Sequence, residues 1–250
     1  MKLIRFLADE REQFGILENN KIYIVKGDIF CEFEKDGKTV DLTNVTILPP
    51  THPSKIVAVG LNYKAHSEEF GEELPDEPRL FLKPSSAVIA HGDAIVRPPQ
   101  SKRVDYEAEL AVVIGKRCSK ISEIEAKDYI LGYTCFNDVT ARDLQRKDGQ
   151  WTRAKGFDTF APIGPWIETE ADPDQLDIRL LLNGKVMQSA NTNQFIFPVY
   201  TLVSYISHVM TLLPGDVIIT GTPSGVGPLH AGDSVTVSIS GVGDLTNSVI

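Results

Sequence analysis

Short apolar runs separated by turn residues dominate the pattern of hydrophobic and polar positions, and they predict a chain built mainly of β-strands. Residues 3–25 already hold three such runs, interrupted by polar turns. The proline-rich segment 48–53 cannot continue a helix and reads as a rigid connector. We therefore expect a small β domain over residues 1–50 and a larger domain over residues 51–250.

The larger domain continues the strand pattern and adds two segments with helical spacing. Strands are expected over 55–60, 79–83, 106–115, 133–137, 177–182, 185–188, 216–220 and 234–239. Helices are expected over 122–131, with Ser122 as N-cap, and over 199–210. Residues 62–70 read as a short helix or a mobile segment, and Asn183-Gly184 favours a hairpin. This mixture predicts a β-rich α+β protein.

Charge and composition remove several classes of function. The 250 residues carry a formal net charge of −9, which argues against a nucleic-acid partner. No apolar stretch reaches the length of about 18 residues that a membrane-spanning helix needs, and charged residues interrupt the N-terminus. The three cysteines are scattered, which argues against a disulfide scaffold or a zinc ribbon. We expect a cytoplasmic protein without membrane contact.

An acidic segment that runs into an apolar strand is the first candidate for chemistry. Because alternate side chains of a strand share a face, Asp105, Glu107 and Glu109 should point the same way, with the last two about 7 Å apart. Such acids are typical of a solvated edge strand or of a site for a hard cation. The apolar residues 110–114 favour the cation, since buried carboxylates need a partner. Asp138 would add a third carboxylate, although Asp is also typical of a turn cap.

Three further features are consistent with catalysis, and each also has a purely structural interpretation. His66 and Glu69 can meet on a helix, where the carboxylate would orient the imidazole, but charged surface helices show the same spacing. Lys155 stands among aromatic and small residues, so its ammonium either holds a substrate oxyanion or is solvated. Residues 220–227 form a glycine-rich turn that either binds an anion or only reverses the chain, and they lack a P-loop motif.

In combination, these motifs resemble the fumarylacetoacetate hydrolase family over most of residues 55–247. The matching segments are 60–63 followed by His66-x-x-Glu69, then 81–84, 105–110, 137–143, 155–165 and 213–216 leading to 220–227. The resemblance implies a mixed β-roll core for the catalytic domain, next to the small N-terminal β domain. It also implies a homodimer. The short N-terminal region is similar to that of members with a single catalytic domain.

The resemblance also implies a set of site residues and a cofactor. It implies Glu107, Glu109 and Asp138 as ligands of Mg²⁺ or Mn²⁺; His66, Glu69 and Lys155 as catalytic residues; Arg142, Gln145 and Thr222 as substrate-binding residues; and Thr159 near the metal. In hydrolytic members the His66–Glu69 dyad would activate water on a lid that substrate orders.

The function implied is that of a Mg²⁺-dependent enzyme for short 2-oxo or enol diacids, acting through an enolate that the metal stabilises. Acylpyruvate C–C hydrolysis is the leading reaction. Oxaloacetate decarboxylation or tautomerisation, and isomerisation of 2-hydroxyhepta-2,4-diene-1,7-dioate from aromatic catabolism, are the alternatives. A catalytically silent metal-binding scaffold is an alternative of another class.

Overall fold

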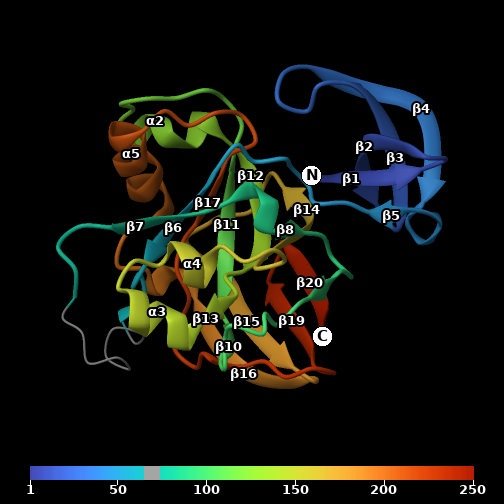
Figure 1. The fold of residues 1–250 in the computed structure, drawn as a ribbon. Helices are drawn as coiled ribbons and strands as arrows, with labels where there is room; N and C mark the ends of the chain where they lie inside the picture. Colours follow the sequence, from blue (N-terminus) through green and yellow to red (C-terminus); the bar gives the residue numbers. More distant parts are fainter. Residues whose placement is uncertain (65–73) are drawn as a thin grey trace.

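The structure is a computed structural model that describes residues 1–64 and 74–250. His66 and Glu69 lie outside the described residues, as does most of the predicted segment 62–70. The described strands group into three sheets (Figure 1). Helices are few and short beside them. The predicted β-rich α+β architecture is therefore confirmed.

The N-terminal strands form a meander that extends the largest sheet. They are β1 (Lys2–Ala8), β2 (Arg11–Glu18), β3 (Lys21–Gly27), β4 (Phe33–Asp41) and the short β5 (Thr46–Ile47), which pairs with β1. Asn19 and Asn20 adopt positive φ in the two-residue turn between β2 and β3, a conformation that Asn tolerates well. Because β1 also pairs with a strand of the main body, the boundary at residue 50 stays a prediction.

The rest of the largest sheet forms the body of the molecule. From the meander outward, its strands are β14 (Ala161–Glu168), β12 (Ile130–Asn137), β11 (Ala108–Ile114), β17 (Val217–Ile219), β6 (Ile56–Gly60) and β7 (Arg79–Lys83), with β8 (Val88–Ile89) on β14. Most neighbours are antiparallel, but β17 runs parallel to β6, and β8 runs parallel to β14. Every residue of β11 is buried, which explains the apolar run 110–114 that follows Glu109.

A second sheet packs against this body. It holds β16 (Lys185–Asn191), β15 (Asp177–Leu182), β19 (Ser234–Ile239), β20 (Gly243–Val249) and β9 (Ala94–Ile95) in that order. The predicted Asn183-Gly184 turn joins β15 to β16, with both residues at positive φ. The main core joins side chains from the two sheets, Leu110 and Val112 with Leu180 and Val237 among them. The small third sheet contains β13 (Thr140–Ala141), β10 (Val104–Tyr106) and β18 (Gly227–Pro228).

The helices differ from the sequence prediction in length and number. α5 (Val199–Val209) confirms the second predicted helix. The first is wrong in extent: Ser122 begins α2 (Glu123–Ala126) with a capping box, but only a 3-10 turn (Lys127–Tyr129) follows. The chain leaves the helix because the Tyr129 carbonyl accepts hydrogen bonds from residues 115 and 116, which draws residue 130 into β12.

Two more short helices have no apolar periodicity and were not predictable from the pattern. They are α3 (Arg142–Asp148) and α4 (Thr152–Lys155), which pack on each other beside β13. Further 3-10 turns occupy Leu42–Asn44, Ser85–Ala87 and Thr192–Gln194. None of the helices in the described ranges is long and apolar enough to cross a membrane.

Candidate metal and substrate site

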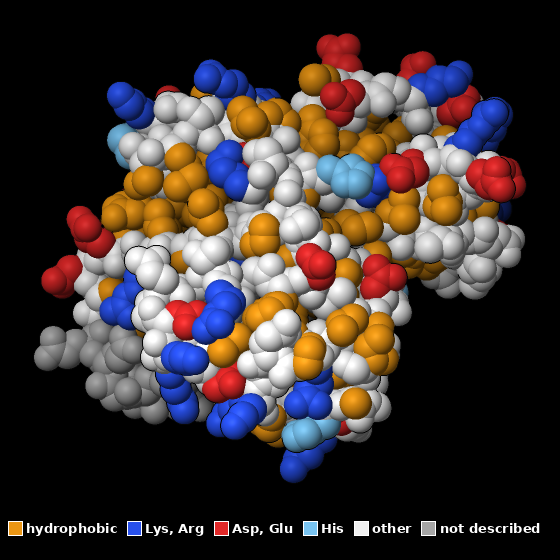
Figure 2. Space-filling model, viewed as in Figure 1, with side chains coloured by type: hydrophobic (Ala, Val, Ile, Leu, Met, Phe, Trp, Pro, Cys, Tyr) orange, Lys and Arg blue, Asp and Glu red, His pale blue; other side chains and the backbone are white. Residues whose placement is uncertain are grey.

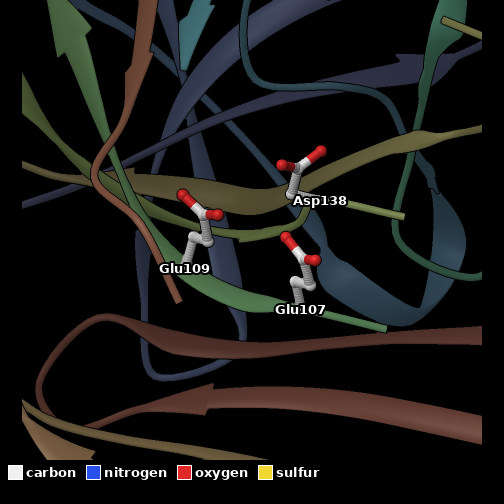
Figure 3. A group of neighbouring side chains, drawn as sticks. All are labelled: Glu107, Glu109 and Asp138. Atoms are coloured by element: carbon white, nitrogen blue, oxygen red, sulfur yellow. The ribbon is translucent and has the colours of Figure 1, made fainter. Parts of the chain in front are cut away.

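Three buried carboxylates converge where two strands of the main sheet are interrupted. Glu107 lies between β10 and β11, Glu109 lies in β11, and Asp138 follows β12 directly. One ligand oxygen from each lies within 4.8 Å of the others. Figure 3 shows the two glutamates on one strand segment, with Asp138 facing them. The structure therefore brings together the three predicted metal ligands.

Local hydrogen bonding explains why the predicted long strand 106–115 breaks at Glu107. The Glu107 amide donates to the side-chain oxygen of Asn137 at 3.0 Å, and its carbonyl accepts the Asp138 amide at 2.8 Å. Before the break, β10 pairs with β13 and β18, whereas β11 pairs with β12 and β17 after it. The change of partners turns Glu107 and Asp138 toward each other.

Three buried cations neutralise most of this negative charge. Lys83 Nζ lies 2.6 Å from Asp138 Oδ1, and Lys155 Nζ lies 2.8 Å from Glu107 Oε2 and also contacts Asp138. Arg142 pairs with Glu107 as well. Burial alone would lower the pKa of Lys155, but Asp138 and Glu107 raise it above its ordinary value. The ammonium of Lys155 is therefore held charged between two carboxylates.

The predicted acid Asp105 does not join the group of three carboxylates. Its oxygens accept from Arg103 Nε at 2.8 Å and from Arg142 Nε at 2.9 Å. Arg142 thus joins Asp105 to Glu107 through one guanidinium and fixes the orientation of both carboxylates.

Glu109 differs from the other two carboxylates because no Lys, Arg or His of the described chain forms an ion pair with it. Its Oε2 accepts the Gly221 amide at 2.6 Å. Burial, and then the charges of Asp138 and Glu107, raise the pKa of Glu109 well above its usual range. A buried carboxylate without a counter-charge is costly, and a cation shared by all three acids would offset that cost.

The donor set fits a hard divalent cation. All three groups offer carboxylate oxygens, which Mg²⁺ and Mn²⁺ accept, and no cysteine or histidine of the described residues belongs to the group. Their separation is small enough for one ion to contact all three. Glu107, Glu109 and Asp138 would hold such a cation and leave its remaining positions to water or substrate.

A cavity of about 210 Å³ opens beside the three carboxylates. It is lined by the three acids, by the predicted residues Arg142, Gln145, Lys155 and Thr222, and by Val59, Gly60, Leu61, Phe81, Arg146 and Trp151. The predicted roles stay predictions, but four of the residues concerned line one cavity. Thr159 is not among the lining residues; its hydroxyl accepts the Val96 amide at 2.9 Å.

Sequence reasoning did not find four residues of this site. Lys83 had a usable signal, since a lysine between an apolar strand and a proline is a candidate for burial. Phe81 and Trp151 form an edge-to-face pair with ring centroids 5.0 Å apart, which makes one wall apolar. That contact joins β7 to the segment before α4, so spacing along the chain does not show it. Arg146 gave no signal because it lies in a run of charged residues.

The chain matches two protein-family models. The model described as fumarylacetoacetate hydrolase C-terminal covers residues 55–250, and that described as Rv2993c-like, N-terminal, covers residues 1–50. Oxaloacetate tautomerase Fahd2a of Rattus norvegicus is 43% identical over 220 residues, which span 83% of this chain and 70% of that protein.

Two solved structures share the whole fold. The 2-hydroxyhepta-2,4-diene-1,7-dioate isomerase of Mycobacterium marinum is 43% identical, with a TM-score of 0.94 and coverage of 100% of this chain and 98% of that one. The maleylpyruvate hydrolase of Sphingobium sp. SYK-6, in complex with manganese and pyruvate, is 30% identical, with a TM-score of 0.83 and coverage of 100% and 99%.

Replacing Glu109 by glutamine tests the metal site. We expect Glu109→Gln to weaken Mn²⁺ binding by at least about tenfold, because a ligand charge is lost. The free energy of unfolding should not fall, since the variant removes an uncompensated buried charge. Calorimetric titration with MnCl₂ and urea unfolding measure the two quantities. Glu123→Gln on exposed α2 is the matched control, and equal Mn²⁺ affinity in both variants would contradict the assignment.

Proposed function

The chain belongs to the fumarylacetoacetate hydrolase family and is an enzyme, and on that premise we propose that it enolises short 2-oxo diacids with the help of a divalent cation. Proton transfer on the enol, as keto–enol tautomerisation or double-bond isomerisation, is the proposed reaction. The observation that carries the proposal is the buried set of three carboxylates, which opens on a cavity with cationic side chains.

The chain's own residues supply the charges that this reaction needs. Glu107, Glu109 and Asp138 would hold Mg²⁺ or Mn²⁺, whose charge would polarise a 2-oxo group and favour its enolate. Lys155 lines the cavity, where its ammonium would stabilise a substrate oxygen that gains negative charge. Arg142 lines the same cavity, with its guanidinium paired to Asp105 and Glu107. The apolar pair of Phe81 and Trp151 excludes water from one side, which strengthens these charge interactions.

Identity to the named relatives supports proton transfer over cleavage. The sequence alone favours acylpyruvate hydrolysis, because His66 and Glu69 have the spacing of a water-activating dyad. The tautomerase and the isomerase are each 43% identical to this chain, whereas the maleylpyruvate hydrolase is 30% identical. We therefore place tautomerisation or isomerisation first and hydrolysis second.

The cellular setting is part of the same proposal. We propose a cytoplasmic homodimer that uses Mg²⁺ or Mn²⁺ and has no nucleic-acid or membrane partner. The family resemblance supports the dimer, and the manganese in the related hydrolase structure supports the choice of cations. The strongly acidic composition supports the lack of a nucleic-acid partner.

A substrate panel tests the reaction directly. With Mg²⁺ present, we expect the enol absorbance of oxaloacetate or of a 2-hydroxydienedioate to decay faster with the enzyme than without it. The product should contain as many carbon atoms as the substrate. Excess EDTA should abolish the acceleration, because the carboxylates alone cannot stabilise an enolate. Ultraviolet kinetics with product identification by mass measure both. Release of CO₂ or of pyruvate as the main product would contradict proton transfer, and no EDTA-sensitive turnover would favour a silent scaffold.

Hydrolysis, the second candidate, has its own variant. If acetylpyruvate is cleaved, His66→Ala should lower the cleavage rate by at least about 100-fold, the usual contribution of a general base. Mn²⁺ affinity should stay unchanged, since the imidazole is not one of the proposed ligands. Pyruvate release and metal titration check the two expectations. His208→Ala, on α5, is the control; cleavage that survives His66→Ala would rule out the proposed dyad.

The position of Arg146 suggests how a diacid is distinguished from a monoacid. Arg146 lies on α3, lines the cavity and is exposed, and it forms no ion pair with any residue in 1–64 or 74–250. The inner cations are already paired with carboxylates. Figure 2 shows several Lys and Arg side chains gathered on the face that α3 and α4 occupy in Figure 1. The second carboxylate of a bound diacid, if it extends outward from the three acids, would contact these positively charged side chains.

We expect Arg146→Gln to raise the KM for fumarylpyruvate about tenfold, with little change in kcat, because a uniform binding contact is lost. The KM for acetylpyruvate, which lacks the distal carboxylate, should stay the same. Lys147→Gln, at the next exposed position, is the matched control. An equal rise in KM for both substrates would show that Arg146 does not bind the distal carboxylate.

A further inference from the structure

Gln188 is buried at a place where the surrounding strand is exposed. It lies in β16, the edge strand of the second sheet, where Val186 and Met187 are 49% and 38% exposed but Gln188 only 1%. Leu180 pairs with Gln188 and Leu181 with Val186, so Met187 forms a bulge. The bulge re-aims the polar side chain inward and leaves two apolar ones outside, the reverse of what solvation favours.

The buried amide of Gln188 makes three hydrogen bonds whose direction is fixed. Its Oε1 accepts the Ala108 amide at 2.9 Å, and its Nε2 donates to the Pro223 carbonyl at 2.8 Å. Since an amide N–H can only donate and a carbonyl can only accept, the side chain cannot be flipped. Its Nε2 must therefore also donate to Thr222 Oγ1, at 2.9 Å.

This bond determines where the Thr222 hydroxyl proton points. The Thr222 Oγ1 accepts a hydrogen bond from Gln188, so its own O–H can donate a hydrogen bond only to another group. No residue in 1–64 or 74–250 accepts it, and Thr222 lines the same cavity as Glu109. The Thr222 hydroxyl is thus oriented as a donor toward whatever occupies the cavity.

The turn that carries Thr222 is held against the bulge by close backbone contact. Gly225 has φ +96°, and a Cβ there would lie 2.5 Å from the Met187 carbonyl oxygen. Only glycine allows this approach. The Oε1 of Gln188, opposite its bonds to Thr222 and Pro223, accepts the amide of Ala108, the residue between Glu107 and Glu109 in the chain. Gln188 therefore joins the cavity-lining turn to the segment that carries two of the proposed metal ligands.

We propose that Gln188 is a positioning residue that fixes Thr222 as a hydrogen-bond donor to an anionic oxygen of the bound oxo acid. Gln188 does not line the cavity and acts through Thr222. The inference rests on the proposed function only in taking a 2-oxo acid as the ligand. Oxalate, a planar dianion with two adjacent carboxylates, serves as the probe because its binding needs no turnover.

A double-mutant cycle in the full-length protein tests the proposal. With Mn²⁺ at saturation, we expect Gln188→Met and Thr222→Val each to raise the Kd for oxalate about tenfold, the usual weight of one charge-assisted hydrogen bond. The double variant should bind no more weakly than either single one, because both changes remove the same contact. Thr222→Ser keeps the hydroxyl and should bind like the wild type. Gln175→Met, at an exposed glutamine, is the matched control.

A second variant covers the case in which Gln188→Met does not fold. In Gln188→Glu one carboxylate oxygen still accepts the Ala108 amide, while the other, in the place of Nε2, accepts a hydrogen bond from the Thr222 hydroxyl, so the direction of that bond is reversed. The Kd of Gln188→Glu for oxalate should rise at least as much as that of Thr222→Val. In proteins that already carry Thr222→Val, changing Gln188 to Glu should leave the Kd for oxalate unchanged.

Additive losses in the cycle would overturn the proposal, because they would show that Gln188 acts by general support of the fold. A wild-type protein that binds Mn²⁺ but not oxalate would overturn it as well. The proposed reaction is judged separately, by turnover of the substrate panel.

Discussion

The cost of burying carboxylates is the constraint on which the rest of the structure depends. Four carboxylates, those of Asp105, Glu107, Glu109 and Asp138, are at least 95% buried. Such a group persists only if cations or hydrogen bonds replace water. The chain provides three buried cations, the exposed Arg103 and one backbone amide for them, and Glu109 is the carboxylate left without an ion pair in the described residues. The site therefore favours one more positive charge, which a divalent cation supplies.

The fold meets this constraint by interrupting strands at one place. β11 lies in the middle of the main sheet and is buried along its whole length, so an acid at its start cannot reach solvent. The end of β12 and the turn after β17 lie beside it and contribute Asp138 and the Gly221 amide. The hydrogen bond from the Glu107 amide to the Asn137 side chain and that from the Asp138 amide to the Glu107 carbonyl hold the break open. The catalytic geometry is thus a consequence of where sheet pairing changes partner.

Sequence alone predicted the parts of the site that follow from local periodicity or from ordered motifs. The grouping of Glu107 and Glu109 follows from the strand period, and Asp138 from its place after a strand. Lys83 and Gln188 were missed because their roles depend on contacts 55 and 80 residues away, to Asp138 and Ala108. The helix over 122–131 was overextended for a related reason: capping at Ser122 is local, but its end is set by sheet pairing at residue 130.

The buried part of the site and the outer part of the cavity contribute differently to the choice between proton transfer and hydrolysis. Stabilising an enolate needs the acids, the cation that they would hold and the nearby ammonium of Lys155, all in the buried part of the site, and forming it also needs a group that accepts the C3 proton. What happens to the enol depends on groups farther out along the cavity. In the described residues these are the apolar pair of Phe81 and Trp151 and the exposed Arg146. None of these three is a general base, so this wall can bind and orient a diacid, whereas the group that takes the C3 proton or activates water must come from another part of the chain.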